Sequence, residues 1–154
     1  MSSACRMVCP AVLIACALVA SPASSGDGKQ APQAGAYEVK VKLELPHLED
    51  ATANKIAVIC VTPSPDTYGL IVLSDNNPLA TCPAQNVHRD GNTLTFDIVC
   101  KGGNAARASA KYVLAPTGFD GTIAMKMGGK NMTMTETQHG RRTGDCTGTD
   151  PPRS

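Results

Sequence analysis

The sequence predicts an all-β protein in which an antiparallel meander curls into a small barrel-like or sandwich-like sheet. Residues 36–45 alternate strictly between apolar and charged side chains, which is the period-two pattern of a half-buried strand. Short apolar segments then recur through the chain, separated by turn signals rich in Gly, Pro, Asn and Asp. Because one sheet must cover its apolar face, we expect the strands to close into a barrel or fold over as a sandwich.

Composition limits the possible classes of protein. The chain has 154 residues, which fits one domain of ordinary size. Its formal net charge of +1 lacks the basic excess that nucleic-acid binding requires, so we expect no nucleic-acid partner. Hydrophobic residues make up 42% and charged residues 18%, which is not the composition of a disordered chain. Only 3% of the residues are aromatic and none is tryptophan, so few rings are available to enlarge the core.

Residues 1–23 have the features of a signal peptide for export. Arg6 supplies the positive charge, residues 7–20 form an apolar segment, and Ser21-Pro22-Ala23 offers small residues for cleavage. The apolar segment is shorter than the roughly 18–20 residues that span a bilayer. We therefore expect a periplasmic or secreted bacterial protein that is cleaved near Ala23 and keeps no transmembrane helix.

A lipid anchor is the alternative at this end of the chain. Leu13-Ile14-Ala15-Cys16 resembles a bacterial lipobox, in which the cysteine would be lipidated and become the new amino terminus. The residues after Cys16 continue the apolar segment instead of starting a polar tether, which favours cleavage near Ala23. An envelope lipoprotein anchored through Cys16 stays open as a hypothesis.

Cleavage near Ala23 would divide the seven cysteines into two groups. Three of them and Arg6 would leave with the signal, so the mature chain would be formally neutral. The other four are Cys60, Cys82, Cys100 and Cys146, and four cysteines in an exported chain predict two disulfides. No C-x-x-C pair occurs and no histidine lies at ligand spacing, which argues against a structural zinc site.

The mature chain divides into three regions. Residues 24–35 form a flexible lead-in, residues 36–146 a single β domain, and residues 147–154 a disordered tail. Within the domain, residues 55–62 are apolar on both faces and predict a more buried strand. Residues 64–73 predict either a short helix or a strand that includes Ile71 to Leu73. Later strands are expected over residues 86–89, 93–100, 105–114, 119–127 and 131–139.

Hairpin geometry suggests how the four cysteines pair. A reversal at Asp90-Gly91 brings Cys82 opposite Cys100, or within one residue of it. This proximity predicts a Cys82–Cys100 disulfide and leaves Cys60 to pair with Cys146.

Four methionines flank Gly128-Gly129 and are expected on one face of a hairpin: Met125, Met127, Met132 and Met134. Methionine commonly serves as a pliable apolar filler, and we favour a place in the core for these four. Clustered thioethers can also bind Cu(I), with His139 as a further ligand, so a metal site at these residues is the alternative.

The sequence contains no recognisable catalytic constellation. His47, His88 and His139 are scattered, and none lies near a serine or cysteine in a nucleophile setting. Arg141-Arg142 could hold an anion or simply end a strand, and no phosphate-cradling glycine loop occurs. We therefore expect neither enzymatic activity nor a cofactor.

The residues that close the domain resemble a known family. Gly140-Arg141-Arg142-Thr143-Gly144-Asp145-Cys146 is similar to the terminal G-[KR]-R-x-G-D-C motif of bacterial exported proteins in the domain-of-unknown-function family numbered 3617. Residues 35–39, 60–63, 89–100 and 119–122 resemble further motifs of that family in the same order. The family usually has tryptophan where Tyr37 stands, and the proline-rich segment 63–81 also departs from its pattern, so the chain resembles a divergent member. The resemblance implies a small envelope β domain with no catalytic residue to carry over.

These expectations describe an exported, disulfide-bonded β domain with a non-enzymatic binding or structural role in the cell envelope. Its partner would be an unidentified envelope ligand or protein, bound in the concavity of the curved sheet. The alternatives are a periplasmic Cu(I)-binding protein that uses the Met hairpin, and the lipoprotein anchored through Cys16.

Overall fold

The computed structural model describes residues 31–46, 52–63, 66–102, 105–128 and 132–147. The predicted signal peptide, the lipobox and most of the tail lie outside these residues, as does His47. The described residues form seven strands and one short 3-10 helix, η1, at Pro78–Thr81. The strands are β1 (Gly35–Glu44), β2 (Thr52–Val61), β3 (Ala84–Asp90), β4 (Thr93–Val99), β5 (Arg107–Ala115), β6 (Gly118–Met127) and β7 (Met132–Gly144).

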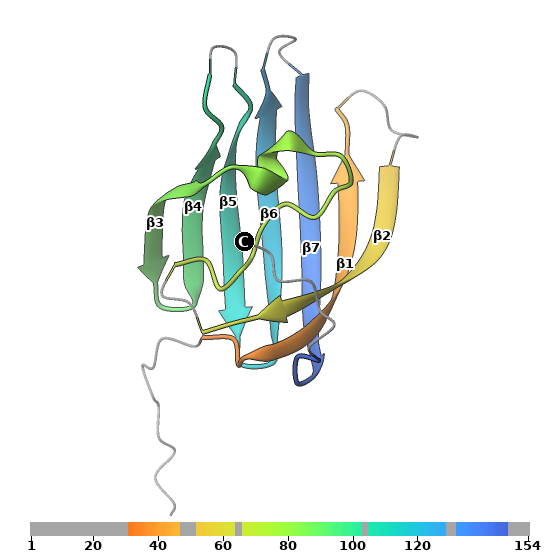
Figure 1. The fold of residues 1–154 in the computed structure, drawn as a ribbon, viewed down its shortest axis with the longest axis vertical. Coiled ribbons are helices and arrows are strands. Elements are labelled where there is room, and N and C mark those ends of the chain that lie inside the picture. Colours follow the sequence, from red (N-terminus) through yellow and green to blue (C-terminus); the bar gives the residue numbers. More distant parts are fainter. Residues whose placement is uncertain (1–30, 47–51, 64–65, 103–104, 129–131, 148–154) are drawn as a thin grey trace, which may run out of the picture.

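All seven strands belong to one antiparallel sheet with the order β2-β1-β7-β6-β5-β4-β3 (Figure 1). Strands β3 to β7 form a meander, and the β1–β2 hairpin is added beside β7. The predicted all-β antiparallel fold is therefore confirmed. The sheet does not close, because β2 and β3 are its two edges and do not pair with each other.

Alternation along β1, β4, β5 and β6 separates a buried inner face from a more exposed outer face. On β1, Tyr37, Val39 and Val41 are buried, as the alternation of residues 36–45 predicts. On β5, small and large apolar residues alternate with exposed ones in the same way, and Tyr112 and Leu114 are fully buried. The buried side chains of all these strands meet in one cluster on the inner face.

A long connection covers this inner face and takes the place of a second sheet. We call residues 66–82 the strap: it contacts β3 near its start, where Tyr68 meets Arg89, runs over the sheet towards β7 and β1, and returns to β3 (Figure 1). Leu70, Val72 and Leu79 of the strap are fully buried in the common core. An open sheet can thus bury its apolar face without closing, because the strap supplies the missing layer.

Residues 66–73 form neither of the two elements predicted for them. Tyr68 and Gly69 have positive φ angles of 57° and 77°, which interrupt both a helix and a strand. Farther along, the N–H groups of Leu73 and Ser74 bond to a side chain of the sheet instead of to a helical carbonyl. Tertiary contacts therefore decide the conformation of this segment, and local propensity does not.

Strand β2 also differs from its prediction, because it is an edge strand and only its inner face is covered. Ile59 and Val61 are buried, whereas Ile56 and Val58 on the outer face are 64% and 51% exposed. A strand that is apolar on both faces is fully buried only where other segments pack against both faces of the sheet. No described residue covers the outer face of β2 at these two positions, and they stay in contact with solvent.

Four aromatic rings form a continuous row within the core. The ring centroids of Phe96 and Tyr112 lie 5.9 Å apart, those of Tyr112 and Phe119 5.8 Å, and those of Phe119 and Tyr37 5.8 Å. Glycines on the neighbouring strands make room for two of these rings. A Cβ at Gly121 would collide with the Tyr112 ring, and one at Gly140 would collide with Phe119. The few aromatic residues are therefore concentrated where they contact one another.

Candidate functional site

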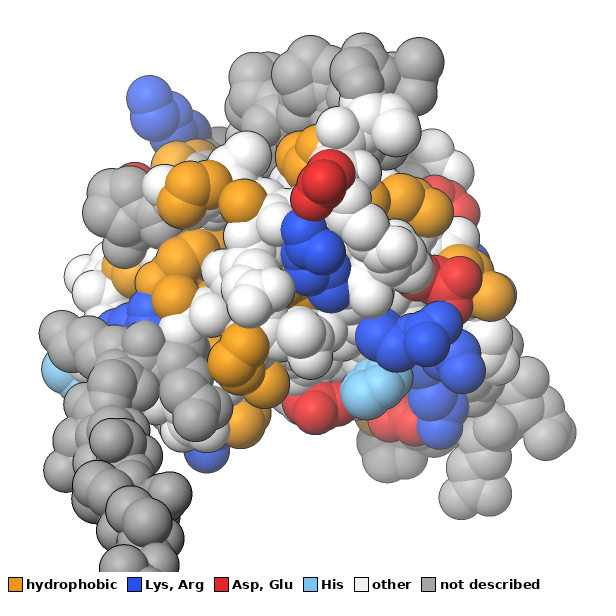
Figure 2. All heavy atoms as spheres, turned by 90° about the horizontal axis from the view of Figure 1, so that it is seen from below, with side chains coloured by type: hydrophobic (Ala, Val, Ile, Leu, Met, Phe, Trp, Pro, Cys, Tyr) orange, Lys and Arg blue, Asp and Glu red, His pale blue; other side chains and the backbone are white. Residues whose placement is uncertain are grey.

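The outer face of the sheet carries an open hollow of about 1030 Å³, which spans β2, β1, β7, β6 and β5. Three lysine side chains point into it, those of Lys40, Lys42 and Lys111, against the single carboxylate of Asp120. Lys55 also borders the hollow, but it stands opposite Val41 on the inner face. This concentration of positive charge is a local property, since the whole chain has a net charge of only +1. The space-filling view in Figure 2 likewise shows Lys and Arg side chains gathered beside a histidine on one side of the molecule.

The strand register arranges the outer-face lining in two parallel rows. One row runs across the five strands in the order Ile56, Lys40, His139, Asp120 and Val113. The next row consists of Asn54, Lys42, Thr137, Thr122 and Lys111. Positively charged side chains therefore stand on both sides of a central floor that carries two threonine hydroxyls.

Ion pairs neutralise part of this charge and leave the rest free. Lys42 Nζ lies 2.5 Å from Glu44 Oε1, and Lys55 Nζ lies 2.5 Å from Asp75 Oδ1 of the strap. His139 Nδ1 lies 2.7 Å from Asp120 Oδ1, so the one carboxylate of the lining is already engaged. Within the described segments, Lys40 and Lys111 form no ion pair. These two ammonium groups are available to an anion that enters the hollow.

Behind the hollow, a buried polar network fastens the strap to the sheet. The carboxylate of Glu136, a fully buried residue, accepts hydrogen bonds from the N–H groups of Leu73 (2.8 Å) and Ser74 (3.0 Å). Gln138 Nε2 donates to the same carboxylate (2.6 Å) and to the carbonyl of Ile71 (2.7 Å). The Tyr112 hydroxyl donates to Gln138 Oε1 (3.0 Å). Within the described segments, no buried side-chain N or O atom lacks a hydrogen-bond partner.

This network changes the acidity of Tyr112. Burial raises the pKa of the phenol well above its usual value of 10, and the nearby Glu136 carboxylate raises it further. The network is not apparent from the sequence, because Glu136 and Gln138 alternate with threonines and resemble an exposed polar strand. Their position in the strand does indicate that they point inward. Glu136 and Gln138 follow Met132 and Met134 at intervals of two residues, so all four side chains lie on the same, inner face of β7.

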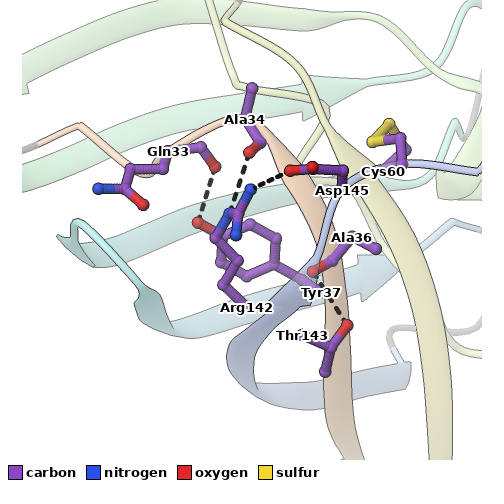
Figure 3. Close-up of a disulfide and its surroundings, with 9 residues drawn as sticks. Gln33, Ala34, Ala36, Tyr37, Cys60, Arg142, Thr143 and Asp145 are labelled. Atoms are coloured by element: carbon purple, nitrogen blue, oxygen red, sulfur yellow. Dashed lines mark hydrogen bonds and ion pairs between the residues drawn. A yellow bond between two sulfur atoms is a disulfide. The ribbon is translucent and has the colours of Figure 1, made fainter.

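The closing motif of residues 140–146 forms a second structural unit, which we call the terminal latch (Figure 3). Arg142 Nε donates to the carbonyl of Ala34 (3.0 Å), and its Nη2 lies 2.6 Å from Asp145 Oδ1. Thr143 Oγ1 donates to the carbonyl of Ala36 (3.1 Å), and Cys146 is disulfide-bonded to Cys60 on β2. The motif therefore ties the end of the chain to both strands of the β1–β2 hairpin.

The start of β1 is held from its other side as well. The Tyr37 hydroxyl donates to the carbonyls of Gln33 (2.8 Å) and Pro116 (3.3 Å), and Gln33 N–H donates to Pro116 (2.9 Å). Residues 33–35 are thus bonded to the domain, although they fall in the predicted flexible lead-in. Burial raises the pKa of Tyr37, while the Arg142 guanidinium opposes this shift.

The second disulfide joins Cys82, at the end of the strap, to Cys100 after β4. The two disulfides in the structure are those that the hairpin geometry predicts. Cys60 lies in β2, ahead of the strap in the chain, and Cys82 is the last residue of the strap.

The predicted methionine cluster lies on the inner face at one end of the β6–β7 hairpin. Met125 stands opposite Met134, and Met127 stands opposite Met132. Met125 is buried, and Asn77 Nδ2 donates to its sulfur at 3.1 Å. Met127 and Met134 pack at the border of the core, and Met132 is 43% exposed. Solvent exposure of the four side chains therefore increases from Met125, which lies in the core, to Met132, which lies at the surface.

Of the two histidines among the described residues, His139 lies in the hollow. His88 is on edge strand β3, opposite Thr95. Among the described residues, no group of three or more His, Cys, Asp or Glu side chains is placed to hold a metal ion. No helix in the described segments is long and apolar enough to cross a membrane.

The fold and its two disulfides define a small, disulfide-bonded antiparallel β domain. The chain belongs to the family described as protein of unknown function (DUF3617), which it matches over residues 32–146. The match includes both disulfides, the strap and the terminal latch. No curated protein and no solved structure matches the chain.

Proposed function

We propose that the chain is an exported, non-enzymatic binding domain of the bacterial cell envelope, and that its outer hollow binds an anionic ligand. The observation that carries this proposal is the convergence of Lys40, Lys42 and Lys111 on one hollow, two of them without an ion pair. A concave site with a few convergent polar groups is the usual form of a ligand site. The inner concavity that the sequence analysis favoured is filled by the strap, so the outer hollow is the better site.

The spacing across the hollow suits a single multivalent anion. Lys42 and Lys111 belong to the same row and are separated by three strand spacings, or about 14 Å. Thr137 and Thr122 lie between them on the floor, where their hydroxyls can donate hydrogen bonds to an anion. Lys40 approaches from the adjoining row. The ligand is therefore held from two sides and from beneath.

Titration with inorganic pyrophosphate, followed by amide NMR shifts on the mature chain, tests this proposal. The largest shift changes are expected at Lys40, Thr122, Thr137 and Lys111. The double variant Lys40→Glu/Lys111→Glu should lose the response, whereas Lys126→Glu, on the same face but outside the lining, should keep it. Shift changes scattered evenly over the surface would refute an anion site in the hollow.

Export is supported by the two disulfides, which persist in an oxidising compartment. The amino-terminal mass of protein isolated from its native cells tests this part of the proposal. A chain that begins directly after Ala23 is expected. A lipid-modified Cys16 at the new amino terminus would establish the lipoprotein instead, and an intact amino terminus would argue against export.

A copper-binding role at the methionine hairpin is the second candidate. The register that favours it places two Met–Met pairs side by side on one face. Against it stands Met125, whose sulfur already accepts a hydrogen bond within the core. Titration with Cu(I), with Met127→Leu/Met132→Leu as the test variant, separates the two roles. Stoichiometric binding that this variant abolishes would establish the metal site.

A further inference from the structure

Each lysine of the hollow that lacks an ion pair has an exposed aliphatic neighbour. Lys40 stands directly opposite Ile56, which is 64% exposed at the edge of the sheet. Lys111 shares the outer face of β5 with Val113, which is 43% exposed. Both aliphatic side chains line the hollow, and Val58 extends the apolar surface along β2. The hollow is therefore flanked by apolar side chains and charged within.

We propose that the ligand of the outer hollow is an anionic amphiphile, whose acid group is bound by Lys40 and Lys111 and whose apolar chain lies against Ile56, Val58 or Val113. This inference rests on the proposed anion-binding function and names the class of its ligand. Burial of exposed aliphatic surface by the ligand would add a favourable contribution that a small inorganic anion cannot supply.

The arrangement on β2 explains why an apolar chain would bind beside the acid group. Ile56 and Val58 are two residues apart on one strand, so their side chains point to the same face. The strand is an edge, and no described residue packs over these two side chains from outside the sheet. An alkyl chain laid along β2 would cover both of them while its acid group contacts Lys40. The lysine stem itself adds apolar surface at that contact.

Calorimetric titration of the mature chain with three probes tests the proposal: dodecyl phosphate below its micelle concentration, inorganic phosphate, and zwitterionic dodecylphosphocholine. Dodecyl phosphate is expected to bind more tightly than either of the other two. Lys40→Glu/Lys111→Glu should weaken its binding by about tenfold or more, because two attractive charges become repulsive. Lys126→Glu serves as the matched control and should have little effect.

Variants of the aliphatic side chains separate the apolar contribution from the charge. Ile56→Ser/Val113→Ser should weaken the binding of dodecyl phosphate by about fivefold and leave the binding of inorganic phosphate unchanged. Val87→Ser changes an exposed valine on the opposite edge strand and should alter neither. All of these positions are on the surface, and circular dichroism checks that each variant folds.

The outcomes distinguish failure of this inference from failure of the proposed function. Equal affinity for inorganic phosphate and dodecyl phosphate would overturn the amphiphile and leave anion binding in place. Equal affinity for dodecyl phosphate and dodecylphosphocholine, with no effect of Lys40→Glu/Lys111→Glu, would overturn both. Absence of binding by every anionic probe would also overturn both.

Discussion

The buried carboxylate of Glu136 on β7 accepts a 2.8 Å hydrogen bond from the backbone N–H of Leu73, which lies 63 residues earlier in the chain. This contact and its neighbour at Ser74 fasten the strap to the sheet. Glu136→Ala should lower the free energy of unfolding by about 3 kcal/mol, because it leaves buried N–H groups without an acceptor. Urea denaturation measures the change. Thr133→Ala, at an exposed position of the same strand, is the control, and an equal loss in both variants would contradict this role for Glu136.

Alkaline pH should weaken the fold through Tyr112. Because burial and Glu136 raise the pKa of its phenol in the folded state, the unfolded chain loses this proton first. The contribution of Tyr112 is fully present below about pH 10, the pKa in the unfolded chain, and declines as the pH rises above it. Tyr37 acts in the same direction. Unfolding free energies measured from pH 8 to pH 11 should fall less steeply for Tyr112→Phe than for the parent chain.

The glycine beneath the Phe119 ring should not tolerate a side chain. Gly140→Ala places a methyl group against that ring, and we expect a loss of about 2 kcal/mol in unfolding free energy from overpacking. Gly144→Ala is the matched control on the same strand, since nothing lies within 4 Å of a Cβ at that position. Thermal unfolding followed by circular dichroism compares the two variants. Equal midpoints would show that the ring moves aside without cost.

The two arginines of the closing motif should differ in their effect on stability. Arg142 is bonded to Ala34 and Asp145, whereas Arg141 is exposed on the outer face. Arg142→Ala should lower the unfolding free energy by about 1–2 kcal/mol and increase amide hydrogen exchange at residues 34–37. Arg141→Ala should change neither quantity. A stronger effect of Arg141→Ala would contradict the structural role that the terminal latch assigns to Arg142.

The disulfide between Cys60 and Cys146 should contribute more stability than the one between Cys82 and Cys100. The first closes a separation of 86 residues and the second one of 18 residues. The chain-entropy relation gives about 4.5 kcal/mol and about 3 kcal/mol for these separations. Guanidinium titrations of Cys60→Ala/Cys146→Ala and Cys82→Ala/Cys100→Ala provide the comparison. The reverse order would show that native-state contacts outweigh the entropy of the unfolded chain.

Much of the sheet could be predicted because alternation is a local property of a strand. The pattern of residues 36–45 gave both the strand β1 and its buried face. The methionines were assigned to one face for the same reason, since residues two apart on a strand point to the same side. The reversal predicted at Asp90-Gly91 likewise joins β3 to β4, although the two turn residues are Gly91 and Asn92, one position later. Local chemistry was sufficient wherever one strand and one turn contained the whole signal.

Features that depend on distant segments could not be predicted in this way. The conformation of the strap depends on Glu136, and nothing within residues 66–82 specifies this acceptor. The hollow depends on which strands are neighbours: Lys40 meets His139 because β1 pairs with β7 and not only with β2. Exposure of Ile56 likewise follows from the place of β2 at the edge.

The sequence by itself thus determined the all-β class, most of the strands, the family resemblance and the pairing of the cysteines. The tertiary structure decided that the sheet stays open, that a strap covers its inner face and that three lysines from two strands share one hollow. The physical reason is the range of the interactions. Side-chain alternation acts between neighbouring residues, whereas strand order, coverage of a face and convergence of charge arise only when segments far apart in the chain come into contact.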